Sequence, residues 1–144
     1  MSSFFIADVA SGYNIFLKRI ISTVSDILIS DLQDMGIILT GTWYQTLDNS
    51  AVRHTLKRHG SIKENLRGQI PVSNEDLMLI PEIIASYEAL IIEKNKRDQN
   101  IITYIKIVED CILFYIEEIR PGRRELAATT MYKRKKKGSP TLID

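Results

Sequence analysis

The sequence predicts an α+β fold in which N-terminal helices pack on a four-stranded antiparallel β-sheet. Three observations lead to this prediction. Apolar residues in the first part of the chain recur at three- and four-residue spacing, the pattern of amphipathic helices. From residue 89 onward β-branched and aromatic residues dominate, as they do in strands. The connections between these later runs are too short for parallel crossovers, so neighbouring strands must be antiparallel.

The first predicted helix covers residues 13–33. Its apolar stripe consists of Phe16, Leu17, Ile20, Ile21, Val24, Ile27, Leu28 and Leu32. Gly36 follows as a C-terminal stop. Residues 37–47 are rich in Ile, Thr, Trp and Tyr, which predicts a short strand or an extended segment.

Two further helical segments follow. Residues 51–59 form the first, which Asp48, Asn49 or Ser50 can cap and Gly60 can close. The second begins after a cap at residue 73 or 74, and Pro81 is expected to divide it into two short pieces.

Four strands complete the predicted fold, over residues 89–94, 101–108, 111–120 and 125–134. Glu109-Asp110 forms a two-residue link between the second and third of these strands, and Pro121-Gly122 signals a turn before the fourth. The C-terminal half is therefore expected to be an antiparallel meander.

Length and composition are those of one ordinary globular domain. The 144 residues are 44% hydrophobic and 26% charged, and a chain of this length can bury a core without disulfides. The single cysteine, Cys111, cannot form an internal disulfide. No apolar run approaches the roughly 20 residues of a membrane span, and the N-terminus lacks signal-peptide features. We therefore expect one domain over residues 1–144, a cytoplasmic location and no membrane partner.

The net charge of +1 conceals an uneven distribution. Residues 48–68 carry +3, residues 69–93 carry −5 and residues 120–144 carry +6. If the fold brings the two basic segments together, they form a surface suited to a polyanion. The lysine-rich run at 133–137 fits a solvated tail equally well.

Both histidines of the chain lie in the helix predicted at 51–59. His54 and Arg58 are four residues apart and share one helix edge. His59 lies about 140° around the helix from His54, because each residue advances about 100°. That angle does not suit a two-histidine metal site, whose ligands are four residues apart on one face. We expect no metal and no cofactor.

The same helix offers the groups that a metal-free ribonuclease needs. Histidine exchanges protons near neutral pH, and the cations Arg53, Lys57 and Arg58 favour its neutral form. RNA cleavage requires a base for the 2′-hydroxyl, an acid for the departing 5′-oxygen, and cations for the charge on the phosphoryl oxygens. His54 and His59 are the candidate acid and base. The alternative for His59 is a contact with the last helix carbonyls.

Three strings carry a resemblance to a known family: DNSAVRHTLKRHG (48–60), RGQIPVSNEDLMLIPEII (67–84) and YIEEIRPGRRELAATTMYKRKKK (115–137). Together they resemble the phage-encoded branch of the barnase–EndoU–colicin–RelE-like (BECR) nuclease superfamily. The match covers residues 37–137, which leaves residues 1–36 as an N-terminal helical part and 138–144 as a tail. The resemblance implies helices followed by a four-stranded antiparallel sheet.

The activity that the resemblance implies is metal-independent endoribonuclease cleavage of RNA by 2′-hydroxyl attack, which leaves a 2′,3′-cyclic phosphate. Transfer RNA is a candidate substrate, the protein would act as a toxin or phage effector, and an immunity or antitoxin protein is a candidate partner. Two alternatives remain open: a non-catalytic nucleic-acid-binding module and a protein-interaction domain, each retaining the same fold.

The basic helix and the resemblance together assign site residues. The expected catalytic residues are His54, His59, Arg123 and Thr130, and the expected RNA-binding residues are Arg53, Lys57, Arg58, Arg124, Tyr132 and Lys133. Arg58, Arg123 or Lys133 would stabilise the phosphorane, and Thr130 would donate a hydrogen bond to a phosphate oxygen. Strand alternation places Thr130 and Tyr132 on one face and Lys133 on the other, so only a bulge or the strand's end could unite them.

Overall fold

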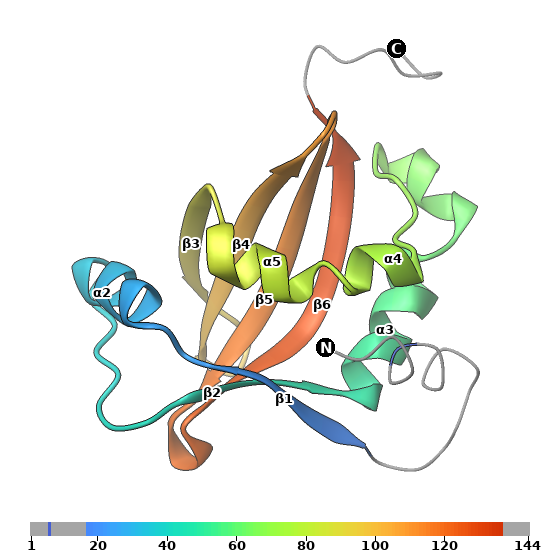
Figure 1. Cartoon of the computed structure of the whole chain (residues 1–144). Coiled ribbons are helices and arrows are strands. Elements are labelled where there is room, and N and C mark those ends of the chain that lie inside the picture. The colour runs from blue at the N-terminus through green and yellow to red at the C-terminus, as the bar shows by residue number, and fades with distance from the viewer. Residues whose placement is uncertain (1–5, 7–16, 137–144) are drawn as a thin grey trace.

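The computed structural model describes Ile6 and residues 17–136 (Figure 1). The elements are β1 (Lys18–Thr23), α2 (Asp26–Asp34), β2 (Tyr44–Asp48), α3 (Asn49–His59), the 3-10 helix η1 (Ile62–Arg67), α4 (Asn74–Leu77), α5 (Ile80–Ser86), β3 (Ala89–Lys94), β4 (Asn100–Val108), β5 (Cys111–Arg120), the 3-10 helix η2 (Pro121–Arg123) and β6 (Glu125–Lys135). The α+β class predicted from the sequence is confirmed.

The sheet has six strands in the order β1-β2-β6-β5-β4-β3. Strands β3 to β6 form the predicted antiparallel meander. The prediction of a four-stranded antiparallel sheet is wrong beyond that meander, because β2 pairs in parallel with the start of β6 and β1 pairs antiparallel with β2. Strand β6 is the last strand of the meander, and pairing with residues 44–46 of β2 satisfies backbone groups at its beginning that an edge strand would leave unpaired.

The helix predicted over residues 13–33 is wrong in its middle, where residues 18–23 form β1. Residues 13–16 lie outside the described part of the chain. Ile20, Ile21 and Thr23 are β-branched and favour a strand. The Ser25 hydroxyl accepts a hydrogen bond from Leu28 N at 3.2 Å, and this cap starts α2 at Asp26.

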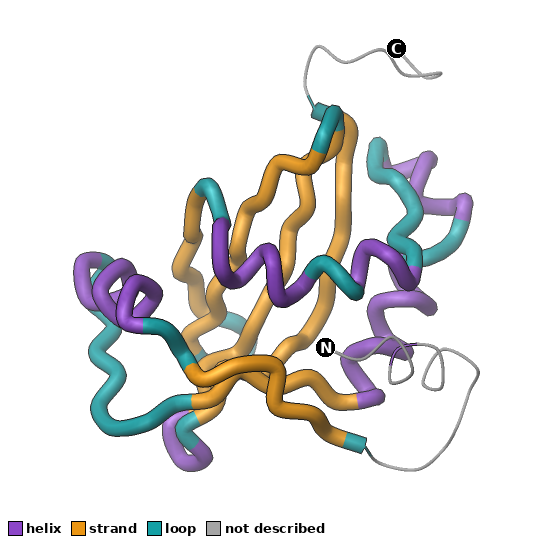
Figure 2. The backbone as a smooth tube through the Cα atoms, viewed as in Figure 1, coloured by secondary structure: helices purple, strands orange, loops and turns teal. Residues whose placement is uncertain are grey.

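Helices α4 and α5 cross one face of the meander (Figures 1 and 2). Ile80 and Ile83 of α5 are fully buried, as are Tyr104 and Tyr115 of the sheet below them. Pro81 lies in the first turn of α5, where a missing N–H costs nothing, so the break between the two helices falls before it rather than at it. None of the described helices is long and apolar enough to cross a membrane.

A carboxyl group lies within this core. Glu117 of β5 is fully buried and accepts hydrogen bonds from the hydroxyls of Tyr104 and Tyr115 and from Gln45 Nε2. Desolvation raises its pKa to about 7, although all three donors oppose the rise.

Helix α3 lies along the edge of β6 beyond the point where β2 ends (Figure 1). Asp48 ends β2 and caps α3, accepting a hydrogen bond from Ala51 N at 2.8 Å. Farther along the same edge, Ile70 N donates to Lys133 O at 2.9 Å. The chain from β2 to residue 70 therefore follows one edge of β6, with α3 in the middle.

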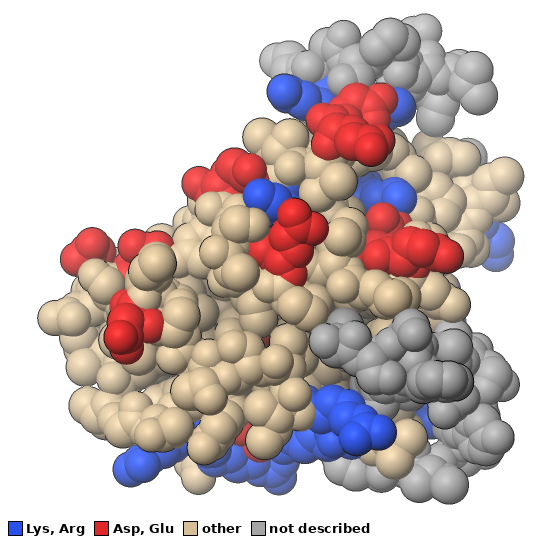
Figure 3. Space-filling view, viewed as in Figure 1, with Lys and Arg blue, Asp and Glu red and all other residues tan. Residues whose placement is uncertain are grey.

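Charge is divided on the helix-bearing side of the molecule. Figure 3 shows acidic side chains over α2, α5 and α4, and Lys and Arg side chains along the edge below β1 and β2. The acidic segment predicted at 69–93 thus contributes carboxylates to the helix-bearing face of the molecule. The opposite face of the sheet lies away from these carboxylates.

Candidate active site

His54 lies on the exposed edge of α3. Val52, Thr55 and His59 face inward and are buried, whereas His54, Lys57 and Arg58 are exposed, as expected for a helix with one face against a sheet. Among the described residues none hydrogen-bonds to the His54 ring. No described residue therefore competes with a ligand for the two ring nitrogens.

A shallow hollow of about 330 Å³ lies beside His54. Its lining comes from the end of β2, the first half of α3, the end of β5 and the bulged part of β6: Asp48, Ser50, Ala51, His54, Arg120, Ala128 and Thr129. The hollow thus combines a group that can transfer protons, His54, with a cation, Arg120.

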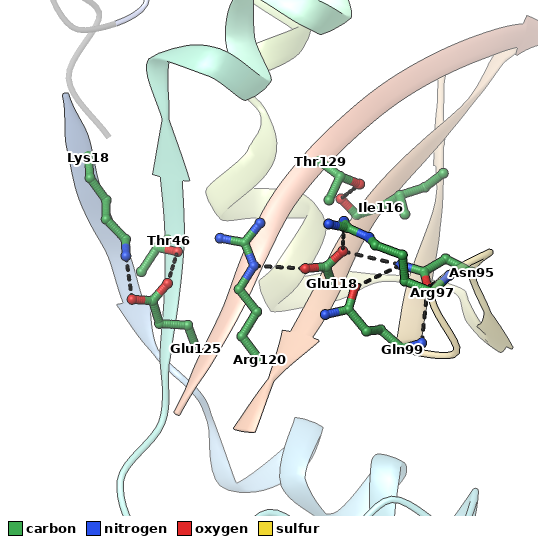
Figure 4. Close-up of polar contacts among 10 residues, drawn as sticks. All are labelled: Lys18, Thr46, Asn95, Arg97, Gln99, Ile116, Glu118, Arg120, Glu125 and Thr129. Atoms are coloured by element: carbon green, nitrogen blue, oxygen red, sulfur yellow. Dashed lines mark hydrogen bonds and ion pairs between the residues drawn. The ribbon is translucent and has the colours of Figure 1, made fainter. Parts of the chain in front are cut away.

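A β-bulge in β6 shapes this hollow. Ile116 pairs with Thr130 and Glu117 pairs with Ala128, so Thr129 is the extra residue. Its hydroxyl donates to Ile116 O at 3.1 Å (Figure 4). The bulge brings Thr129 to the hollow in place of its predicted neighbour, Thr130.

A second hollow of about 400 Å³ shares Arg120 with the first. It is lined by Arg97, Gln99, Glu118, Arg120, Pro121, Gly122 and Arg123. Figure 4 shows the Glu118 carboxylate between two arginines: Arg120 Nε donates to it at 2.9 Å and Arg97 Nη2 at 3.0 Å. Because two guanidinium groups surround one carboxylate, the cluster has a net positive charge, and this charge faces solvent.

Sequence reasoning did not propose Arg97, Glu118 or Arg120. Part of the signal was present, because Glu118 and Arg120 are two residues apart in a strand and must share a face. Opposite charges on one face of a strand otherwise rich in apolar residues indicate a polar site. Arg97 could not be found this way, since only the pairing of β3 and β4 brings their turn beside β5.

Of the predicted arginines beyond α3, Arg123 lines the second hollow and Arg124 does not. Arg124 has a left-handed backbone with φ of 51° and lays its guanidinium against Gly41. Gly41 itself has a φ of 80°, in the left-handed region that favours glycine.

His59 lies away from both hollows. It is 8% exposed, its Nδ1 is 2.9 Å from Glu64 Oε2, and its ring centroid is 5.9 Å from that of Tyr132. Tyr132 in turn stacks on Phe114 with the ring centroids 4.6 Å apart. The structure therefore does not bring the two histidines together.

The remaining predicted residues are dispersed along β6 and α3. Thr130 Oγ1 accepts a hydrogen bond from Thr55 of α3 at 3.5 Å, and Lys133 pairs with Asp76 of α4 at 2.7 Å. The bulge precedes Thr130, so it does not place Thr130 and Lys133 on one face. Arg53 is half-buried on α3.

Other reactive groups contribute little to the hollows. Within Ile6 and residues 17–136, no three His, Cys, Asp or Glu side chains cluster as a metal site requires. Burial and the nearby Asp110 carboxylate raise the pKa of the Cys111 thiol, which keeps the thiol protonated and weakly nucleophilic.

A family model described as phage-Barnase-EndoU-ColicinE5/D-RelE like nuclease3 matches residues 22–139. The matched range includes α3, the bulge and both hollows. Searches of curated proteins and of solved structures gave no significant match.

Proposed function

This chain belongs to the phage-Barnase-EndoU-ColicinE5/D-RelE like nuclease family, and on that premise we propose that it is a metal-independent endoribonuclease. One observation carries the proposal: His54, Arg120 and Thr129 line a single hollow open to solvent. A nuclease acting without a metal needs proton transfer and positive charge at one phosphate, and this hollow supplies both.

In the proposed mechanism the substrate phosphate lies against Arg120, and His54 faces the reacting ribose. His54 in its neutral form accepts the proton of the 2′-hydroxyl, whose oxygen attacks the phosphorus. The P–O5′ bond breaks, the 5′-oxygen takes a proton from water, and a 2′,3′-cyclic phosphate remains. Arg120 stabilises the negative charge that builds up on the phosphoryl oxygens, because a guanidinium donates in a fork that matches them.

The other predicted residues act less directly in this proposal. Arg123 stays near the phosphate path through the second hollow, and the exposed Lys57 and Arg58 extend the positive charge along α3. His59 contacts Glu64, and Thr130 contacts Thr55. In this proposal His59 and Thr130 therefore support the structure around the site and do not contact the reacting atoms.

RNA as the substrate, transfer RNA among the candidates, follows from the requirement for a 2′-hydroxyl. The role of toxin or phage effector, an immunity or antitoxin partner and a cytoplasmic site of action belong to the same proposal. The first two rest on the family to which the chain belongs, and the cytoplasmic site rests on the sequence features given above.

The test is incubation of the purified protein with total tRNA in EDTA, alongside the variants His54→Ala and Lys63→Ala. We expect cleavage by the wild type and a loss of at least about 100-fold in His54→Ala, the usual contribution of a general acid or base. Lys63 is exposed and lines neither hollow, so Lys63→Ala should cleave like the wild type.

No cleavage by the wild type, or equal cleavage by His54→Ala, would contradict the proposal. Salt-dependent RNA binding without scission would instead support the non-catalytic nucleic-acid-binding alternative.

A further inference from the structure

We propose that the second hollow binds the phosphate next to the scissile one, so that the substrate is an RNA strand with at least two consecutive phosphates. The binding groups are Arg97, Arg120 and Arg123, and Glu118 is the residue that positions the first two. This inference rests on the proposed function, because the scissile phosphate is taken to lie at His54 and Arg120.

The Glu118 carboxylate is fully engaged. Its side chain is 5% exposed, Oε1 accepts from Arg120 Nε, and Oε2 accepts from Arg97 Nη2 and from Asn95 Nδ2 at 3.2 Å. Its effect is to fix two guanidinium groups whose other N–H donors remain unused among the described residues.

The turn between β3 and β4 is built to hold Arg97 in place. Asn95 Oδ1 accepts from Arg97 N at 2.9 Å and from Gln99 N at 3.0 Å, while its amide reaches Glu118 (Figure 4). Asp98 takes the left-handed conformation that closes this turn. The Arg97 side chain is nevertheless 73% exposed, so it is tethered at one nitrogen and open to solvent at the rest.

The charge of the hollow favours an anion. Three arginines and one glutamate line it, and Arg123 makes no ion pair with any described residue. The two arginines on Glu118 neutralise its charge, so the hollow keeps positive charge for a ligand. Fixed guanidinium groups bind phosphate with little loss of side-chain entropy.

The two hollows are adjacent, because Arg120 lines both of them. A nucleic-acid strand whose scissile phosphate contacts Arg120 from the His54 side would place its adjoining phosphate near Arg97 and Arg123. The structure thus favours a strand over an isolated dinucleotide linkage.

The test measures binding of 2′-deoxy oligonucleotides, which lack the attacking hydroxyl and remain intact. A deoxydinucleotide has one internucleotide phosphate and a deoxytrinucleotide has two. We expect the wild type to bind the trinucleotide about tenfold more tightly, since one charge-assisted phosphate contact contributes about that factor. Arg97→Gln should reduce this ratio to about one, and Glu118→Gln should reduce it as well because Arg97 and Arg120 lose their common anchor.

Lys96→Gln is the matched control. Lys96 lies next to Arg97 in the same turn and is exposed, but it does not line the hollow, so its removal should leave the ratio unchanged. An equal ratio in the wild type and Arg97→Gln, or an equal drop in Lys96→Gln, would overturn the proposal. A length-dependent ratio without RNA cleavage would leave the phosphate site standing and overturn the nuclease function alone.

Discussion

His54 and His59 are five residues apart on α3, yet one is exposed beside Arg120 and the other is buried against Glu64. The sequence could identify both as candidates because they share a basic helix. Their difference in burial follows from the two faces of α3 on which they lie, and η1 then brings Glu64 back to His59, a contact that the helical spacing does not predict.

We therefore expect substitution of His59 to affect mainly stability and substitution of His54 to affect mainly activity. His59→Ala leaves the buried Glu64 carboxylate without its imidazole partner and should lower the free energy of unfolding by about 3 kcal/mol. His54→Ala removes an exposed ring and should change it by less than about 0.5 kcal/mol. Urea denaturation of both variants measures this, and equal losses would contradict the assignment of roles.

Glu117 gives the fold a pH dependence of its own. Its pKa is raised to about 7 in the folded state from an ordinary value of 4.5, so the unfolded chain ionises first as the pH rises. The stabilisation is complete below pH 4.5 and is lost as the pH rises through 7, by about 3 kcal/mol in total. Glu117→Gln cannot ionise and should lack this loss.

The measurement is the free energy of unfolding of the wild type and Glu117→Gln at several pH values between 4 and 8. As the pH rises across this range, the free energy of unfolding of the wild type should fall relative to that of Glu117→Gln. A difference that stays constant would show that the carboxyl titrates alike in both states.

At the scale of elements, the four C-terminal strands and helix α3 with its cap and stop were predictable, and β1 was not. Strands β3 to β6 have sharp local signals, including the links at Glu109-Asp110 and Pro121-Gly122, and their predicted bounds agree with the structure to within one residue. Residues 18–23 have apolar spacing that also fits a helix. They become a strand because they pair with β2, about 25 residues later, and such a partner leaves no local trace.

The bulge at Thr129 also could not be predicted from the local sequence. Alternation along β6 is correct on each side of the bulge, but a single extra residue decides whether position 129 or 130 meets His54. Nothing in the run Ala-Ala-Thr-Thr specifies which residue is extra, because that depends on the register with β5.

The element that positions His54 is α3, and its start depends on Asp48. The carboxylate accepts a hydrogen bond from Ala51 N at 2.8 Å. Asp48→Ala should therefore cost about 1 kcal/mol of folding stability, whereas Asp48→Asn, which keeps an acceptor, should cost only a few tenths. Thermal unfolding followed by circular dichroism separates the two variants, and an alanine variant as stable as the asparagine variant would exclude a capping role.

At the scale of the whole molecule, a near-neutral chain separates its charges. Acidic side chains gather over the helix layer (Figure 3), Arg97 and Arg120 meet at Glu118 (Figure 4), and Arg123 lines the same hollow. The sequence indicated that basic segments could converge. Which residues converge depends on the twist and pairing of the six-stranded sheet, because these arginines come from two different turns and the end of a strand.

The most direct test of the central claim compares one RNA oligonucleotide that the protein cleaves with the same strand carrying a single 2′-deoxy nucleotide on the 5′ side of the cleavage position. Attack by the 2′-hydroxyl predicts that the all-ribose strand is cut to a fragment ending in a 2′,3′-cyclic phosphate and that the substituted strand stays intact there. Cleavage of the deoxy-substituted bond, or a fragment ending in a free 3′-hydroxyl, would contradict the account.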